Sequence, residues 1–314
     1  MVQALLAGIN GIRFDLTISQ AFEFYLAEKK EPDPYKRKKQ LQRFERAKNA
    51  LLHVTGQDIP ISKVSRVHAR RVRDDYLTRM STAAAKRNLN DLKSVFSYVI
   101  REHDLTQRNP FSELELPKPE DAAINLRHSL PRNIIGEMYR QLDGSQTLLD
   151  VWTLLHHTGA QSAEILGLQG NDVKIDEEIP HIEIKPYGLR SVKDTSRIRK
   201  VPLIGRAYDV VARRAESVTD GEFLFPEYGP TEKHDNFSQK ARYRLSKVTD
   251  NPKHTVYSLR HSMKDALRDA DVGYRIENAL LGHTNGKSSS FQYESAPRLE
   301  ELYEAMKRVD FDVQ

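Results

Sequence analysis

YSLRHS at residues 257–262, LLGH at 280–283 and SSSFQYESA at 288–296 decide how this chain is interpreted. They set an arginine, a histidine and a tyrosine in a fixed order, each after a predicted helix or turn. An arginine can bind two phosphate oxygens at once, a histidine can donate a hydrogen bond, and a tyrosine can act as a nucleophile.

Length and composition set broad limits on the protein. The 314 residues predict about two domains, and 39% hydrophobic with 30% charged residues is typical of a soluble globular protein. The chain has no cysteine, which excludes disulfides and cysteine-bound metals and favours a reducing cytosol. No apolar run approaches the roughly 18 residues of a membrane span. The apolar N-terminal stretch lacks a basic start, so it is not interpreted as a signal peptide.

Charge is divided unevenly along the chain. Residues 1–117 hold 21 Lys+Arg and 14 Asp+Glu, a net charge of +7, whereas residues 118–314 hold 28 and 30, a net charge of −2. A basic first part predicts attraction to phosphate groups without sequence preference. A lysine-rich helical domain with no such partner explains the charge equally well.

The first part of the sequence has the periodicity of four helices, at about 17–30, 34–52, 65–80 and 81–103. Thr17 and Ser81 or Thr82 are N-cap candidates, and Pro34 suits the first turn of a helix. Gly56 is a stop signal after the second helix, whose predicted apolar face is Leu41, Phe44, Ala47 and Leu51. The pattern predicts a small helical bundle.

The segment NPFSELELPKPEDAA at 109–123 breaks this periodicity with three prolines and four acids. It predicts an extended linker. The sequence is therefore divided into a helical domain at 1–112, a linker at 113–126 and a second domain at 127–314.

The second domain mixes helices and strands. Alternating runs at 172–176, 181–185 and 199–204 predict a small antiparallel sheet, with a turn signal at 186–188. Helical patterns fill the rest of the domain, at 131–142, 146–157, 162–168, 205–217, 236–249, 258–270, 273–281 and 297–309. The fold class is mainly α with a small antiparallel sheet.

Two further segments, HTGAQSAEILGL at 157–168 and VKDTSRIRKVPL at 192–203, precede the three quoted above. In this order the five segments resemble the tyrosine recombinase (phage integrase) family. The resemblance covers about residues 15–309. It implies an N-terminal helical core-binding (SAM-like) bundle and an α+β catalytic domain. It also implies cutting and rejoining of DNA through a phosphotyrosine.

The resemblance gives roles to individual residues. Tyr293 matches the nucleophile, ten residues after His283, which matches a donor to a non-bridging phosphate oxygen. Arg260 matches the second of the family's two arginines. Lys193 matches the lysine that protonates the leaving 5′ oxygen, with Lys200 as its rival in the following strand.

Three positions near these motifs call for separate comment. Gln161 stands where the family pattern TGxR has its first arginine, and a neutral amide brings no charge to a phosphate. Glu164 matches the acid three residues later, which orients that arginine. Tyr257 stands where many relatives have a histidine that assists acid–base chemistry, and a phenol is a poor base near neutral pH. His254, three residues earlier still, is not assigned that role.

A basic helix in the first domain is the candidate DNA-contacting surface. Acids at i+4, which would make a salt-bridged solvent face, are mostly absent from it. The basic residues predict phosphate contacts, which position a protein without reading sequence. Residues of two helices make up this set: Lys36, Arg37, Lys38, Lys39, Arg43 and Arg46 from one, and Lys86 and Arg87 from another.

The resemblance implies a site-specific recombinase of a prophage or other mobile element, acting in viral or element DNA integration in the cytoplasm, at the nucleoid. Its implied partners are double-stranded DNA at attachment sites, three further copies in a tetramer docked through helix 297–309, and accessory DNA-bending or directionality factors. No ATP, metal or other cofactor is implied. Gln161 leaves open a catalytically inactive DNA-binding protein on the same fold, and a relaxing topoisomerase is a third alternative.

Overall fold

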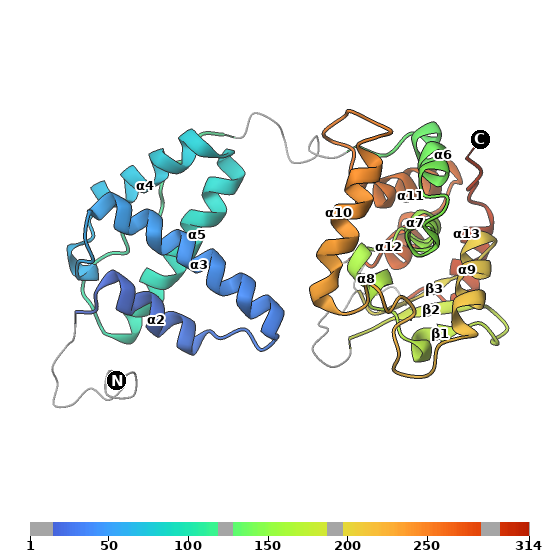
Figure 1. Cartoon of the computed structure of the whole chain (residues 1–314), viewed down its shortest axis with the longest axis horizontal. Helices are drawn as coiled ribbons and strands as arrows, with labels where there is room; N and C mark the ends of the chain where they lie inside the picture. The colour runs from blue at the N-terminus through green and yellow to red at the C-terminus, as the bar shows by residue number, and fades with distance from the viewer. Residues whose placement is uncertain (1–14, 119–127, 187–196, 284–295, 314) are drawn as a thin grey trace. The chain divides into compact units, whose positions relative to one another are not determined.

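A computed structural model of the chain describes residues 15–118, 128–186, 197–283 and 296–313 (Figure 1). The chain divides into two compact units, Met1–Ala122 and Ala123–Gln314, called here the first and the second unit. The first unit has one hydrophobic core cluster, and the second has two that adjoin along its helices.

The described part of the first unit is a bundle of four helices: α2 (Ile18–Glu28), α3 (Pro34–Thr55), α4 (Arg66–Arg79) and α5 (Thr82–Glu102). Local signals set their ends. Thr17 caps α2 in a reciprocal capping box with Gln20. Pro34 is the first residue of α3, and Gly56 ends that helix with a left-handed φ of 76°. Ser81, rather than Thr82, is the N-cap of α5.

The core of the first unit confirms all but one of the apolar positions predicted for α3. Phe44, Ala47 and Leu51 are buried, but Leu41 is 44% exposed. The prediction for Leu41 was wrong because helical spacing shows which residues share a face and does not show how far the covering helices extend along it.

The first residues of the predicted linker lie against the first unit. Arg66 Nη1 donates to Pro110 O at 2.9 Å and Arg66 Nη2 to Glu113 O at 2.6 Å. Arg73 Nη1 donates to Glu115 O at 3.2 Å. Helix α4 therefore holds the chain in place as far as residue 115.

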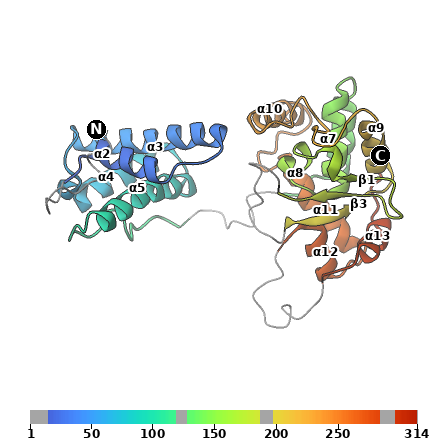
Figure 2. The same ribbon diagram turned by 90° about the horizontal axis from the view of Figure 1, so that it is seen from below.

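The second unit combines helices with a three-stranded antiparallel sheet of order β1-β2-β3, which confirms the predicted fold class. Its register pairs Val173 with Ile182 and Ile182 with Val201. Figure 2 shows α12 and α13 beside β3. The elements are α6 (Arg132–Gln141), α7 (Gln146–Thr158), α8 (Ser162–Leu166), β1 (Val173–Lys174), β2 (His181–Ile184), β3 (Arg199–Pro202), α9 (Arg206–Ala215), α10 (His234–Leu245), α11 (Ser258–Asp269), α12 (Tyr274–Leu281) and α13 (Leu299–Lys307).

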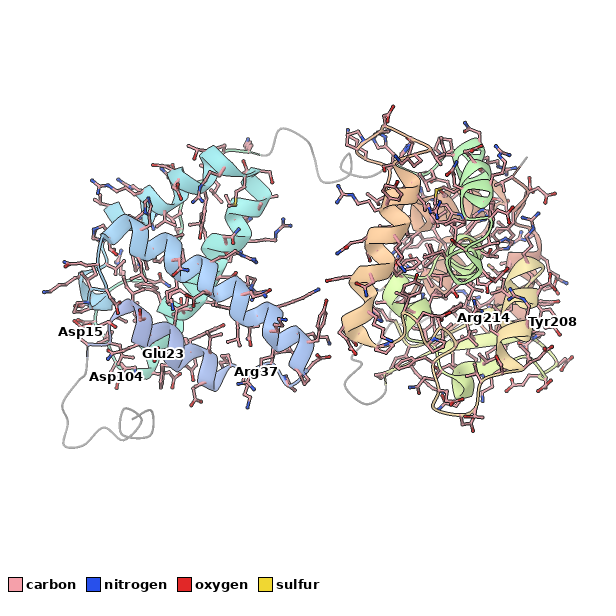
Figure 3. The ribbon with its side chains drawn as sticks, viewed as in Figure 1. Asp15, Glu23, Arg37, Asp104, Tyr208 and Arg214 are labelled. Atoms are coloured by element: carbon pink, nitrogen blue, oxygen red, sulfur yellow. The ribbon has the colours of Figure 1, made fainter. Side chains whose placement is uncertain are left out.

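Helix α7 forms the centre of the second unit and packs against α9 and α11. Trp152 is only 1% exposed there. The buried carboxylate of Asp150 accepts hydrogen bonds from Arg213 at 2.6 Å and Arg214 at 2.7 Å, so α9 is tied to α7 by charge as well as by packing. Figure 3 labels Arg214. In the described ranges no helix combines the length and apolar character needed to cross a bilayer.

The C-terminal helix α13 packs on its own unit. Leu302 and Met306 are buried with Met263 of α11 and Leu280 of α12. The apolar face that was predicted to dock on a neighbouring copy is therefore covered within the same chain here. Docking through that face would require α13 to leave this position.

Candidate functional site

Arg260 lies in the first turn of α11 and is buried, with 3% of its surface exposed. Its Nη1 donates to Gly159 O at 2.8 Å and its Nη2 to Leu281 O. These bonds join the start of α11 to the turn after α7 and to the end of α12. The buried Nε has no hydrogen-bond partner among the described residues. Burial, and next the charge of Arg199, lowers the pKa of Arg260 to about 10, so it keeps its positive charge at neutral pH.

The carboxylate of Glu164 is paired with a positively charged side chain of strand β3. Arg199 Nη2 donates to its Oε2 at 2.9 Å and Arg199 Nη1 to its Oε1 at 3.2 Å. The backbone N–H of Gln161, the residue before α8, donates to Oε2 at 2.8 Å. Burial raises the pKa of Glu164, but the hydrogen bond and charge of Arg199 outweigh it, so the pKa lies below its ordinary value. Glu164 is thus an ionised carboxylate that fixes the position of the Arg199 guanidinium.

Arg197 approaches the same carboxylate, with Nη1 at 3.6 Å from Glu164 Oε1 and a side chain that is 20% exposed. Neither Arg197 nor Arg199 was predicted as a site residue. The two arginines stand two positions apart in RIR at 197–199, at the start of β3, but nothing in the sequence pairs them with Glu164. Lys200 follows Arg199, is 48% exposed, and has Nζ at 3.8 Å from Glu183 Oε1.

His283 follows Gly282, which ends α12 with a left-handed φ of 64°. The backbone N–H of His283 donates to Asn278 O at 2.9 Å. Burial, and next the charge of Arg260, lowers the pKa of His283 to about 4. The imidazole is therefore neutral at pH 7 and carries one N–H donor and one lone pair.

Tyr257 precedes α11, and its ring packs edge-on against His261 at 5.5 Å between centroids. His254 is held in the preceding turn, with Nδ1 2.9 Å from Thr249 Oγ1 and Nε2 3.3 Å from Asn251 Nδ2. It is bound within its own turn. Among the described residues, no three His, Asp or Glu side chains form a metal-binding group.

Two predicted residues lie outside the described residues. Lys193 falls within 187–196 and Tyr293 within 284–295. Of the predicted catalytic set, the structure brings together Arg260, Glu164, His283 and the backbone of Gln161, from segments that span residues 159 to 283.

Known proteins with similar sequences are all named tyrosine recombinases. The tyrosine recombinase XerC of Pediococcus pentosaceus is 26% identical over 245 residues, covering 73% of this chain and 76% of that protein. Tyrosine recombinase XerC 2 of Ralstonia nicotianae is 30% identical over 216 residues, covering 62% of this chain and 56% of that protein. No family model matches the sequence. The chain is thus similar to tyrosine recombinases over more than half of its length.

Solved structures share the fold of this chain. A lambda integrase tetramer bound to a Holliday junction superimposes with a TM-score of 0.64 and 15% identity, over 94% of this chain and 84% of that one. The Tn1549 transposon integrase in complex with transposon right end DNA gives a TM-score of 0.62 and 16% identity, over 93% and 99%.

The basic residues predicted for DNA contact are spread over the first unit. Figure 3 labels Arg37 near the start of α3. Lys36, Lys39, Arg43 and Arg46 line a surface hollow of about 510 Å³ on that helix. The charge of Arg43 is partly neutralised, because its Nε lies 3.0 Å from Asp91 Oδ2 of α5. Lys86 and Arg87 lie near the start of α5 and are exposed.

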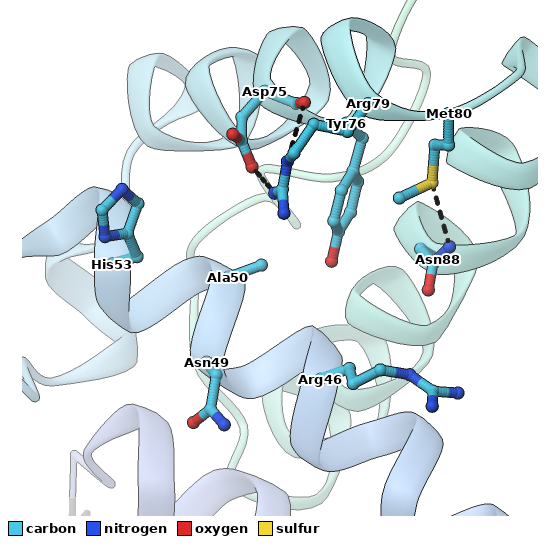
Figure 4. Close-up of a pocket in the computed structure, with 9 residues that line it drawn as sticks. All are labelled: Arg46, Asn49, Ala50, His53, Asp75, Tyr76, Arg79, Met80 and Asn88. Carbon is cyan, nitrogen blue, oxygen red and sulfur yellow. Dashed lines mark hydrogen bonds and ion pairs between the residues drawn. The ribbon is translucent and has the colours of Figure 1, made fainter.

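A second hollow of about 650 Å³ lies between α3, α4 and α5 (Figure 4). Arg46 lines both hollows, and Arg79 adds a second guanidinium that bonds to Asp75 of its own helix. Asn49 of α3 and Asn88 of α5 also line this hollow, and the Asn88 amide donates to Ala84 O of its own helix at 3.0 Å. Sequence reasoning did not single out either residue, because an isolated asparagine on a helix carries no pattern of its own.

Proposed function

We propose that this protein is a site-specific DNA recombinase that cuts and rejoins DNA strands through a 3′-phosphotyrosyl intermediate on Tyr293. The observation that carries the proposal is the meeting of three segments at one point. Arg260 bonds to Gly159 and Leu281, Glu164 bonds to Arg199, and His283 lies within the field of Arg260. These are the segments whose order resembles the family, and they supply positive charge and hydrogen-bond donors for a phosphate.

The chemistry at this site follows from the residue types. The buried, unpartnered Nε of Arg260 is a donor that an anion would satisfy, and a buried unpaired donor is costly when left empty. Neutral His283 can donate one hydrogen bond to a phosphate oxygen. These groups stabilise the charge that builds up on the phosphate as a fifth oxygen bonds to it.

The proposed reaction has two steps. The Tyr293 oxygen forms a bond to phosphorus as the bond from phosphorus to the 5′ oxygen breaks. The phenol releases its proton to solvent, and the 5′ oxygen takes up a proton from Lys193. In the second step the 5′ oxygen of a partner strand bonds to phosphorus as the bond from phosphorus to the Tyr293 oxygen breaks. The attacking hydroxyl gives its proton to Lys193, which the first step left neutral, and the tyrosine oxygen takes up a proton from solvent. The bond energy is retained, so neither step needs ATP.

The neighbours support DNA as the partner, because the solved integrases of the same fold were bound to DNA. The first unit would supply phosphate contacts from its basic residues, with Arg46 between its two hollows. Assembly into a tetramer would require a docking element, and α13 can serve only if it leaves its own unit.

The test uses nicked duplexes tiled across the DNA that flanks the gene, since a mobile-element enzyme acts beside its own ends. A nick next to the cleavage point makes the fragment with the free 5′ hydroxyl short enough to diffuse away. Rejoining is then impossible, and the covalent adduct is trapped. We expect a protein–DNA adduct that is lost in Tyr293→Phe. An adduct that persists in Tyr293→Phe would refute the assignment of the nucleophile.

A second candidate function is DNA binding without strand cleavage, which Gln161 favours because it leaves position 161 uncharged. Removing one transition-state donor costs about 10²–10³ in rate. A duplex that binds the protein but yields an adduct only with Gln161→Arg would support this alternative.

A further inference from the structure

Gln161 brings no positive charge to the site. A positive charge that replaces the missing arginine must therefore come from a different segment of the chain. The backbone N–H of Gln161 donates to Glu164 Oε2 at 2.8 Å, which places the start of its side chain beside this carboxylate. A guanidinium that approaches Glu164 from elsewhere therefore enters the space next to residue 161.

The guanidiniums of Arg199 and Arg197 approach the Glu164 carboxylate, but only that of Arg199 is hydrogen-bonded to it. Arg199 bonds to both carboxylate oxygens and donates its Nε to Leu280 O at 2.8 Å, with a side chain that is 5% exposed. It neutralises Glu164 and is locked in place. Arg197 is different, because its Nη1 lies 3.6 Å from Oε1, which is beyond hydrogen-bond distance, and its side chain is 20% exposed.

The charges around this carboxylate do not cancel. Among the described residues, the charges of Arg197, Arg199 and Arg260 act on one acid, Glu164, an excess of two positive charges in a largely buried place. Lys264 is balanced by Glu277, whose Oε1 lies at 3.2 Å. Burial, and next the charge of Arg260, Lys264 and Arg197, depresses the pKa of His283, so Arg197 acts within the same field. An anion bound here would relieve the repulsion.

We propose that Arg197 supplies the positive charge that residue 161 lacks, by turning from Glu164 to the phosphate at which the strand is cut. The inference rests on the proposed function and names a further catalytic residue for it. When Arg197 turns away, Glu164 keeps its salt bridge to Arg199. The rotation of Arg197 therefore does not leave a buried carboxylate without a counter-charge. The guanidinium keeps its bidentate geometry for phosphate, which the amide of Gln161 cannot replace.

The experiment measures adduct formation on the nicked flanking duplexes with wild type, Arg197→Ala, Gln161→Arg and the double variant Gln161→Arg/Arg197→Ala. Arg140→Ala is the matched control, because it removes an arginine from a surface pair with Glu137 in the same unit. A parallel duplex carries an uncharged methylphosphonate at the cleavage point. We expect Arg197→Ala to slow cleavage about 10²–10³-fold, the double variant to recover most of that loss, and Arg140→Ala to match wild type.

The methylphosphonate duplex separates an electrostatic role from a structural one. A methylphosphonate carries no negative charge that a cation must neutralise. Arg197→Ala and wild type should therefore cleave this duplex at similar rates. An equal defect on both duplexes, or no defect on the normal one, would overturn the inference. Either of these results, obtained with adduct from wild type, would leave the proposed function intact. An adduct from Gln161→Arg but none from wild type would overturn the inference together with the proposed strand cleavage, and would support DNA binding without cleavage. No adduct from either protein on any flanking duplex would overturn both.

Discussion

Arg199 of β3 and Glu164 of α8 form a two-point salt bridge, with Nη2–Oε2 at 2.9 Å and Nη1–Oε1 at 3.2 Å. Their side chains are 5% and 8% exposed, and the residues lie 35 positions apart. Arg199 also donates to Leu280 O, so one side chain joins β3, α8 and the end of α12. This pair holds in place the segments that carry Gln161, Arg197 and His283.

Breaking this pair should destabilise the second unit. Glu164→Gln leaves Arg199 buried without its counter-charge, and such a loss costs about 3–5 kcal/mol. Urea unfolding followed by the fluorescence of Trp152 reports this unit, because Trp152 is the only tryptophan of the chain and is buried in α7. Glu137→Gln, from an exposed pair with Arg140, is the control and should leave the midpoint unchanged. Equal midpoints for the two variants would contradict the role of the pair.

The buried pair His156 and His157 predicts a stability that depends on pH. Burial, and next the charge of Arg206 for His156 and of His156 for His157, lowers their pKa values from 6.5 to about 4 and about 3. Between about pH 4 and 6.5 the unfolded chain therefore binds more protons than the folded one. Stability from this source is full above pH 6.5 and is lost as pH falls, by up to about 1.4 kcal/mol per pH unit for each histidine.

This dependence is measured by Trp152 fluorescence in urea at pH 7 and pH 5. His157→Gln removes one of the two titrations, so the difference between the two pH values should shrink relative to wild type. His128→Gln, which removes an exposed histidine, should leave the difference unchanged. A pH difference that His157→Gln does not alter would exclude His157 as a source.

Gly282 is predicted to be required for space as well as for backbone conformation. Its φ is 64°, and an added Cβ would lie 2.7 Å from Arg199 Nη1. Gly144 has a φ of 79° with nothing within 4 Å of an added Cβ. Both alanine variants incur the left-handed backbone cost of about 1–2 kcal/mol, but only Gly282→Ala displaces Arg199. The unfolding midpoint of Gly282→Ala should therefore lie below that of Gly144→Ala, and equal midpoints would contradict the contact.

The basic surface of the first unit should show in the salt dependence of DNA binding. Each phosphate contact lowers log K against log[salt] with a slope of about 0.9, so Lys86→Ala should reduce the magnitude of the slope by about that amount. Arg101 lies at the opposite end of α5 and is paired with Glu102 at 2.9 Å. Arg101→Ala should leave the slope as in wild type. Identical slopes for both variants would remove Lys86 from the contact surface.

Much of the fold was predictable because local rules set the ends of its elements. Thr17, Pro34, Gly56 and Gly282 begin or end helices as their chemistry requires. The exposure of Leu41 was not predictable, because it depends on where the neighbouring helices lie.

The site was only partly predictable. Arg260, Glu164 and His283 belong to motifs that can be found one segment at a time. Arg197 and Arg199 become site residues only through the carboxylate of Glu164, and that contact joins positions more than thirty residues apart. The roles of Lys193 and Tyr293, which lie outside the described residues, stay predictions.

The covalent link itself tests the central claim most directly. Adduct trapped on a nicked flanking duplex would be digested with nuclease and protease, and the modified peptide identified by mass spectrometry. The proposal predicts one nucleotide-bearing peptide, with the 3′-phosphate joined to the oxygen of Tyr293. A phosphate joined to any other residue, or a DNA-binding Gln161→Arg variant that forms no adduct on a nicked cognate site, would contradict it.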